Sequence, residues 1–74
     1  MTTNPRPPLG RPLTPREVEI LAAAADGRTV AHTARHLFIG ERTVKEHRAR
    51  ILAALGARSI THAVAIAFRR RLLT

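Results

Sequence analysis

Histidine, serine and carboxylate side chains are the groups in this 74-residue chain that could act in catalysis or bind a metal ion. His32 and His36 stand four residues apart, the spacing of a metal clamp on a helix, but no Glu lies between them and no third ligand is evident. Ser59, the single serine, is better placed to cap a helix than to act as a nucleophile, and the five carboxylates form no acid–base pair. We therefore expect no enzymatic activity, no metal ion and no cofactor.

The charge of the chain indicates a different chemistry. Thirteen basic residues against 5 acidic ones give a net charge of +8, and twelve of the thirteen are Arg, which suits forked contacts with phosphate and guanine. Chains this basic bind polyanions such as nucleic acid or an anionic membrane surface. No apolar run approaches the ~18 residues of a membrane span, and no Trp supports a cationic tail on a membrane surface, so nucleic acid is the expected partner and a membrane is not. A cationic membrane-binding helix bundle stays as a third interpretation. The absence of cysteine fits a reducing compartment, and we expect a cytoplasmic protein.

Composition and proline placement predict the domain organisation. Thirteen alanines and few β-branched runs favour helices, so the expected fold class is all-α. Four of the five prolines fall within residues 1–12, which we expect to form a flexible Pro-rich arm or linker without fixed structure. Residues 13–74 are then the folded domain.

Helix-capping residues indicate where the first two helices begin and end. Thr14-Pro15-Arg16-Glu17 reads as a capping box that starts a helix ending before Gly27. Its apolar positions at helical spacing are Val18, Leu21, Ala22 and Ala25. Thr29 caps a second, short helix over residues 30–37, whose inner side carries Ala34 and Leu37.

Two further helices complete the domain. The third spans about residues 41–55 and is stopped by Gly56; its apolar face holds Val44, Ile51 and Leu55, with His47 as a half-buried, hydrogen-bonded side chain between them. The fourth runs from its cap at Ser59 to about Leu72. Its inward residues are expected to be Ile60, Val64, Ala67 and Phe68. The pattern does not show which of them pack in the core and which lie in a dimer interface.

The second and third helices flank a three-residue turn, Phe38-Ile39-Gly40, which is typical of a helix-turn-helix. Turned away from the apolar stripe of the third helix are Arg42, Lys45, Glu46, Ala49 and Ala53. A helix face with polar or small side chains fits the major groove of DNA. There Glu46 could accept a hydrogen bond from the cytosine amino group, and Ala49 could contact a thymine methyl group. Arg42 and Lys45 would meet phosphates or purines, and Thr43 and Arg50 lie at the flanks, suited to phosphates.

These residues together resemble a known domain. The matching segments are Leu13-Thr14-Pro15-Arg16-Glu17, Gly27, residues 34–39, residues 41–48, Ile51, residues 55–59 and Ala63-Val64. They resemble the LuxR-type (LuxR/FixJ/GerE) DNA-binding domain over about residues 13–73. The resemblance implies a four-helix domain whose third helix enters the major groove.

The resemblance also implies roles for particular residues. Positions matching Lys45, Glu46 and Ala49 face the bases, and the positions that hold the DNA backbone are assigned to Arg42, Thr43, Arg50, Arg35 and Arg48. The fourth helix is expected to pair with its copy in a homodimer through Ile60, Ala63, Val64 and Ala67. The chain departs from the family pattern at Gly40 in place of Ser, at His32-Thr33 in place of Glu-Ile and at His62 in place of Glu.

The resulting hypothesis is a dimeric, sequence-specific, double-stranded DNA-binding transcriptional regulator, with RNA polymerase as a further candidate partner. The alternative is a protein-interaction adaptor of the same fold that contacts the transcription machinery without reading bases. Sequence-dependent and salt-dependent DNA affinity would separate the two.

Overall fold

The described part of the chain contains the four predicted helices. The computed structural model describes residues 10–73, and over that range it holds α1 (Pro15–Ala25), α2 (Val30–Leu37), α3 (Glu41–Leu55) and α4 (Ile60–Arg69), with no β-strand. The predicted all-α, four-helix domain is confirmed. Residues 1–9, which carry most of the predicted arm, lie outside the described residues.

The helix ends follow the predicted caps, with one exception. Thr14 Oγ1 accepts from the Glu17 N–H, and Glu17 accepts from the Thr14 N–H, so the capping box is complete. α4, however, ends at Arg69 and not near Leu72. The cause is a turn in which the Leu72 N–H bonds the Ala67 carbonyl at 2.8 Å while Arg71 adopts a φ of 58°.

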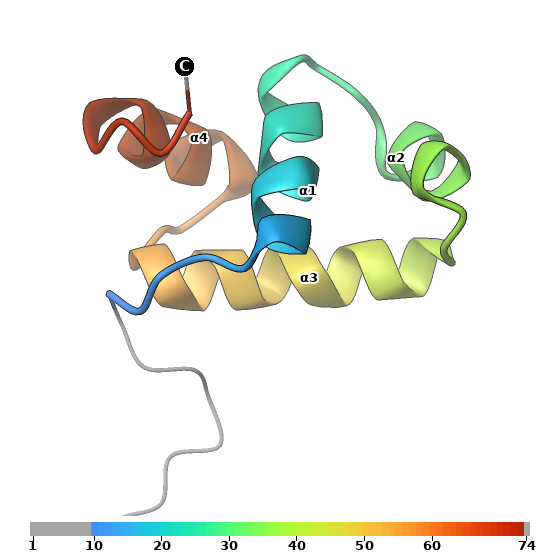
Figure 1. Cartoon of the computed structure of the whole chain (residues 1–74), viewed down its shortest axis with the longest axis horizontal. Coiled ribbons are helices and arrows are strands. Elements are labelled where there is room, and N and C mark those ends of the chain that lie inside the picture. Colours follow the sequence, from blue (N-terminus) through green and yellow to red (C-terminus); the bar gives the residue numbers. More distant parts are fainter. Residues whose placement is uncertain (1–9, 74) are drawn as a thin grey trace, which may run out of the picture.

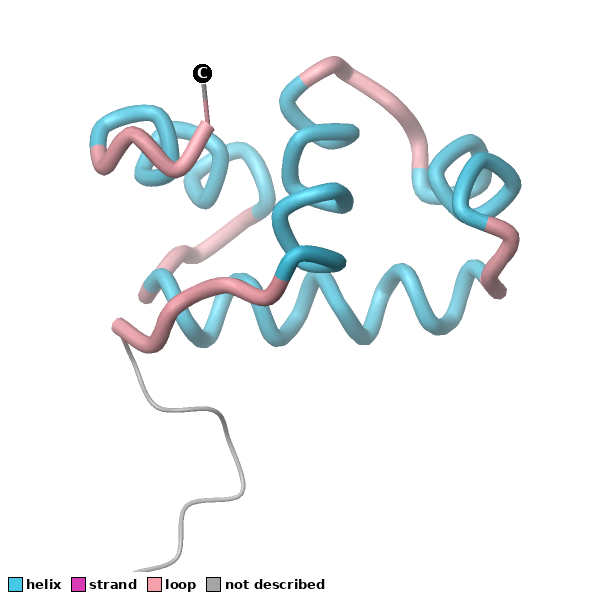
Figure 2. Tube along the Cα trace, viewed as in Figure 1, coloured by secondary structure: helices cyan, strands magenta, loops and turns pink. Residues whose placement is uncertain are grey.

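The longest helix, α3, is the platform on which the other three rest. α1 stands on its middle, α2 lies at its N-terminal end and α4 lies toward its C-terminal end, with α1 also packed on α4 (Figure 1). The connections between helices are short loops (Figure 2). No single helix within residues 10–73 is long and apolar enough to cross a membrane, although α3 and α4, bent by 50° at their junction, pass that test as a pair by length and composition alone.

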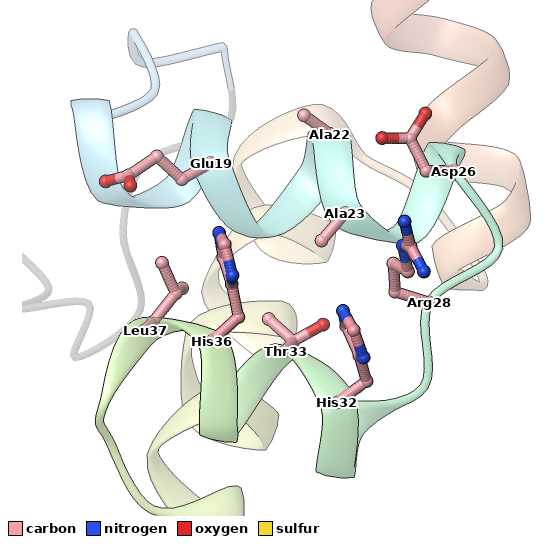
Figure 3. A pocket seen from close by; sticks show the side chains of 9 residues that line it. All are labelled: Glu19, Ala22, Ala23, Asp26, Arg28, His32, Thr33, His36 and Leu37. Carbon is pink, nitrogen blue, oxygen red and sulfur yellow. The ribbon is translucent and has the colours of Figure 1, made fainter.

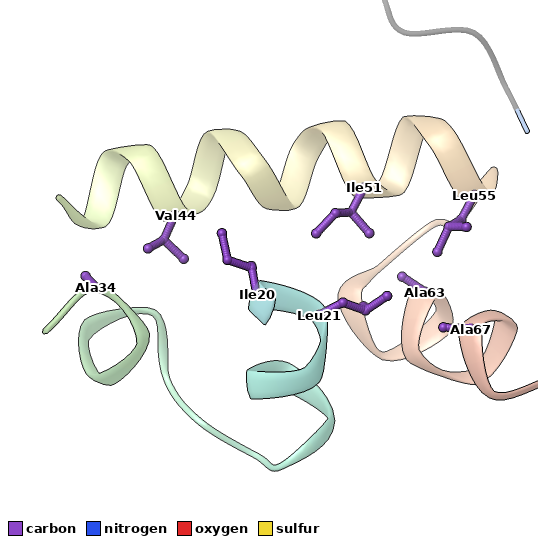
Figure 4. Packing of buried hydrophobic residues seen from close by; sticks show 8 residues of the cluster. All are labelled: Ile20, Leu21, Ala34, Val44, Ile51, Leu55, Ala63 and Ala67. Atoms are coloured by element: carbon purple, nitrogen blue, oxygen red, sulfur yellow. The ribbon is translucent and has the colours of Figure 1, made fainter. Parts of the chain in front are cut away.

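The hydrophobic core lies where these helices meet (Figure 4). Its buried members are Ile20, Leu21, Ala34, Val44, Ile51, Leu55, Ala63 and Ala67. For α1 the predicted inward face is wrong in part: Ile20 and Leu21 are fully buried, whereas Val18, Ala22 and Ala25 are only partly buried. Phe68 was also expected inside and is 48% exposed, because the alanines of α4 occupy the inward positions.

A buried ion pair ties the segment before α1 to the domain. Arg11 donates both arms of its guanidinium to the two Glu17 oxygens, at 2.8 and 2.7 Å, and the side chains are 19% and 3% exposed. The Gly10 N–H also bonds the Ala54 carbonyl of α3 at 2.7 Å. The hydrogen bonds from Arg11 lower the pKa of Glu17 from 4.5 to about 2, and the bond from the Thr14 N–H acts in the same direction. Residues 10 and 11, assigned from sequence to the arm, are therefore anchored to the helices.

Candidate nucleic-acid interface

The side of α3 that faces away from the core carries the predicted base-reading residues. Lys45, Glu46 and Ala49 are all exposed, as is Arg42 one turn earlier. Helical spacing puts them on one strip, opposite the buried Val44 and Ile51. No salt bridge within residues 10–73 involves Arg42, Lys45 or Glu46, so their charges are available to an outside partner.

The residues predicted to hold the DNA backbone are not all placed alike. Arg35 on α2 and Arg50 on α3 are exposed, and Thr43 is half-buried at the flank of the strip. Arg48 is different, because it follows Val44 by four residues and shares its inward side. Its guanidinium lies 3.5 Å from the Arg28 carbonyl, and its Nε is buried without a hydrogen-bond partner. The structure therefore disfavours Arg48 as a backbone contact.

His47 lies beside this strip and is half-buried, as predicted. Its Nδ1 is buried and finds no hydrogen-bond partner among the described residues, so the expected hydrogen bond is missing at that atom.

A shallow pocket of about 310 Å³ lies between α1 and α2 (Figure 3). It is lined by Glu19, Ala22, Ala23, Asp26, Arg28, His32, Thr33, His36 and Leu37. His32 and His36 point from α2 toward α1 with their rings nearly parallel, at 9° and 6.2 Å between centroids. No group of three or more metal-ligand residues is found within residues 10–73. The pocket has no α3 residue in its wall and is thus separate from the exposed strip.

The predicted dimer residues on α4 divide into two kinds. Ala63 and Ala67 are fully buried against the domain's own core, so they have no surface left for a partner, and that part of the prediction conflicts with the structure. Ile60 and Val64 are partly buried against the same core. The exposed stripe of α4 is instead formed by Thr61, Ala65 and Phe68, at i, i+4 and i+7, while the exposed Leu72 lies beyond the end of the helix at Arg69. We call it the α4 stripe; its spacing was present in the sequence and was missed.

Comparison with known proteins identifies the domain. Residues 11–67 match the family model described as bacterial regulatory proteins, luxR family. The chain belongs to this family. The match begins at Arg11, the residue that pairs with Glu17, and ends within α4. The resemblance drawn from the sequence motifs is thereby confirmed.

Individual members support the same assignment. The domain is 39% identical over 70 residues to the transcriptional activator protein BjaR1 of Bradyrhizobium diazoefficiens, covering 95% of this chain and 29% of BjaR1. It is 41% identical over 61 residues to the transcriptional regulatory protein LiaR of Bacillus subtilis, covering 82% of this chain and 29% of LiaR. The chain therefore spans less than a third of these luxR-family regulators.

A solved structure shows the same fold. A complex of Vibrio cholera VqmA with a ligand and DNA contains a region that superposes with a TM-score of 0.75 at 30% sequence identity. The match covers 95% of this chain and 30% of that one. The luxR-family domain described here thus corresponds to one part of a longer regulator in each relative.

Proposed function

We propose that this luxR-family domain binds double-stranded DNA in a sequence-dependent way and thereby regulates transcription. The observation that carries the proposal is the α3 strip, where Lys45, Glu46 and Ala49 are exposed, unpaired and spaced along one helical face. An α-helix of this kind fits the major groove, which is about 12 Å wide. Membership of a family of bacterial regulatory proteins supports the same function.

The strip separates two kinds of contact. Lys45 and Glu46 in the middle are suited to base edges, since Lys donates to guanine acceptors and Glu accepts from the cytosine amino group. Arg42, Arg50 and Arg35 are exposed around them and supply positive charge for phosphates. Base contacts would then set the preferred sequence, and phosphate contacts would set the overall affinity and its salt dependence.

The test is selection of bound duplexes from a random library, followed by titration of the selected duplex and a scrambled duplex at several salt concentrations. We expect Lys45→Ala to reduce the ratio of specific to scrambled affinity, by about 5- to 100-fold for a lost base contact. Arg42→Ala should weaken both duplexes alike and lower the slope of log affinity against log salt by about 1. Arg69→Ala, which removes the same charge from the end of α4, is the matched control and should change neither quantity by as much.

Two results would contradict the proposal. A wild-type domain that selects no sequence, with binding that disappears at physiological salt, would leave only generic charge and would favour the adaptor function. A Lys45→Ala variant with an unchanged specificity ratio would remove α3 from base reading even if the domain binds a preferred site.

We further propose that two copies bind adjacent half-sites and pair through the α4 stripe. Phe68 is 48% exposed and shares one face of α4 with Ala65, and Leu72, which is 42% exposed, follows in the turn after the helix. A twofold pair of such helices would bury these side chains against their own copies. Half-sites on one face of the duplex would then lie about 10 bp apart.

The dimer is tested by comparing duplexes that hold one or two half-sites. Ala65→Glu places a charge on the α4 stripe and should abolish cooperative binding to the paired sites while single half-site affinity falls only slightly. His62→Glu adds the same charge on α4 beside the stripe and serves as the control. Equal cooperativity in the wild type and in Ala65→Glu would exclude the α4 stripe as the seam.

A further inference from the structure

Phe38 adopts a backbone conformation that its side chain disfavours. Its φ and ψ are 58° and 42°, in the left-handed region, where the Cβ of an L-residue crowds the neighbouring carbonyl. At the corresponding ends of α1 and α3, the chain uses Gly27 and Gly56 with φ values of 77° and 66°. The end of α2 therefore carries a strained aromatic residue at a position where glycine is the unstrained choice.

Burial does not compensate for this strain. The Phe38 side chain is 94% exposed, the highest value among the large hydrophobic residues that the structure describes as exposed. Its neighbour Ile39 is packed against the core and already fills the turn. The ring of Phe38 thus gains little from the domain itself, and strained residues that the fold does not need are concentrated at functional sites.

The place of Phe38 indicates which surface it contacts. Phe38 follows α2 and lies in the turn that leads into α3, the helix that carries the strip. Figure 1 shows this turn at the N-terminal end of α3. α3 has 15 residues and is about 22 Å long, so its first residue lies about 7 Å along the axis from the centre of the strip at residues 45 and 46. The half-width of the major groove is only about 6 Å. When α3 is inserted with its axis inclined to the groove, the turn before its first residue therefore approaches one sugar–phosphate wall.

Charge around the turn favours DNA over a protein surface. Arg35 precedes Phe38 by one helical turn and Arg42 follows in the first turn of α3, and both are exposed. An aromatic side chain flanked in the sequence by two exposed Arg residues suits the apolar deoxyribose surface that lies between neighbouring phosphates. We infer that Phe38 is an uncharged anchor that packs on the deoxyribose wall of the major groove and fixes the N-terminal end of α3.

This inference rests on the proposed DNA binding, and it predicts an unusual combination of effects. Phe38→Asn removes the ring while placing at residue 38 a side chain that tolerates the left-handed region. The denaturation midpoint should stay the same or rise. The affinity for the selected duplex should fall about tenfold through the loss of one buried aromatic contact. Because no charge is lost, the salt slope should equal that of the wild type, unlike the slope of Arg42→Ala.

Two companion variants make the test specific. Arg71→Asn changes the other non-glycine residue within residues 10–73 that has a φ of 58°. Its denaturation midpoint should likewise stay the same or rise, but its affinity for the selected duplex should not fall tenfold. Phe38→Leu keeps an apolar side chain and should retain most of the binding. If the wild type binds a selected sequence and Phe38→Asn binds it within twofold, the anchor is wrong and Phe38 serves a protein partner instead. A wild type without sequence preference refutes the proposed function itself, which is a separate outcome.

Discussion

Replacing Glu17 by Gln tests whether the buried ion pair with Arg11 holds the start of the domain in place. Gln has nearly the same shape and keeps one oxygen for the Thr14 N–H, so the change removes the charge and the second oxygen, which accepts from Arg11 Nη2 at 2.7 Å. In the folded domain the pKa of Glu17 is lowered from 4.5 to about 2 by the Arg11 hydrogen bonds. At 1.36 kcal/mol per pKa unit, this corresponds to about 3 kcal/mol of stability when Glu17 is ionised. Domains of this size have about 3–10 kcal/mol in total, so the loss should be large.

The sign of the pH dependence follows from the same shift. Because the folded domain binds the Glu17 proton more weakly than the unfolded chain does, the contribution is fully present above pH 4.5 and is lost as the pH falls toward 2. The chain has no Trp or Tyr, so urea unfolding is best followed by circular dichroism in the far ultraviolet, at pH 7 and at pH 3. Glu17→Gln should lower the free energy of unfolding at pH 7 by about 2–4 kcal/mol. Between pH 7 and pH 3, the free energy of unfolding of the variant should fall by less than that of the wild type.

A double-mutant cycle with Arg11→Met isolates the pair. The coupling free energy should exceed about 1.5 kcal/mol, well above the value of an exposed ion pair. A coupling below about 0.5 kcal/mol would mean that Arg11 is solvated in solution. The reasoning is also refuted if Glu17→Gln keeps the full acid sensitivity of the wild type, because Glu17 would then not be its source.

Two further changes test the helix cap and the core. Gly40 caps α3 with φ and ψ of −74° and 154° and no side-chain bond, and a Cβ there would meet only Thr43 Oγ1 at 3.9 Å. Gly40→Ser should therefore stabilise the domain by about 0.3–1 kcal/mol in urea unfolding, and a destabilised variant would contradict the open geometry. Ile20→Ala should cost about 2–5 kcal/mol and Phe68→Ala about 1 kcal/mol or less, and equal costs would mean that Phe68 is buried after all.

Helix boundaries were predictable because they depend on local chemistry. The Thr14–Glu17 capping box and the glycines at 27 and 56 act within one turn of the residue that they cap, so the sequence alone contains the information. The rotation of α1 depends on its neighbours. Residues 22–25 are all alanine and offer little contrast between one side of the helix and another, so only packing against α3 and α4 shows that Ile20 points inward.

The candidate site was predictable to the extent that it lies on one helix. The exposed positions of α3 follow from helical spacing, which also places Arg48 on the inner side with Val44. α4 has apolar residues on most sides, so spacing alone does not show which of them are buried. The structure separates them because small Ala63 and Ala67 let α4 approach its neighbours closely, which leaves Phe68 outside. The Arg11–Glu17 pair joins residues on either side of a helix start and has no repeating pattern to reveal it.

The position of α3 has a consequence for how the domain's specificity can change. Since α3 contacts all three other helices, its inward residues Val44, Ile51 and Leu55 are tied to the stability of the whole fold. The outward residues Lys45 and Glu46 touch none of that core, and exposed substitutions usually change stability by about 0.5 kcal/mol or less. Under the proposed base reading, the preferred sequence of this domain can therefore change while its core is preserved. For this domain, exchanging the outward residues of α3 should alter the preferred sequence before it alters the fold.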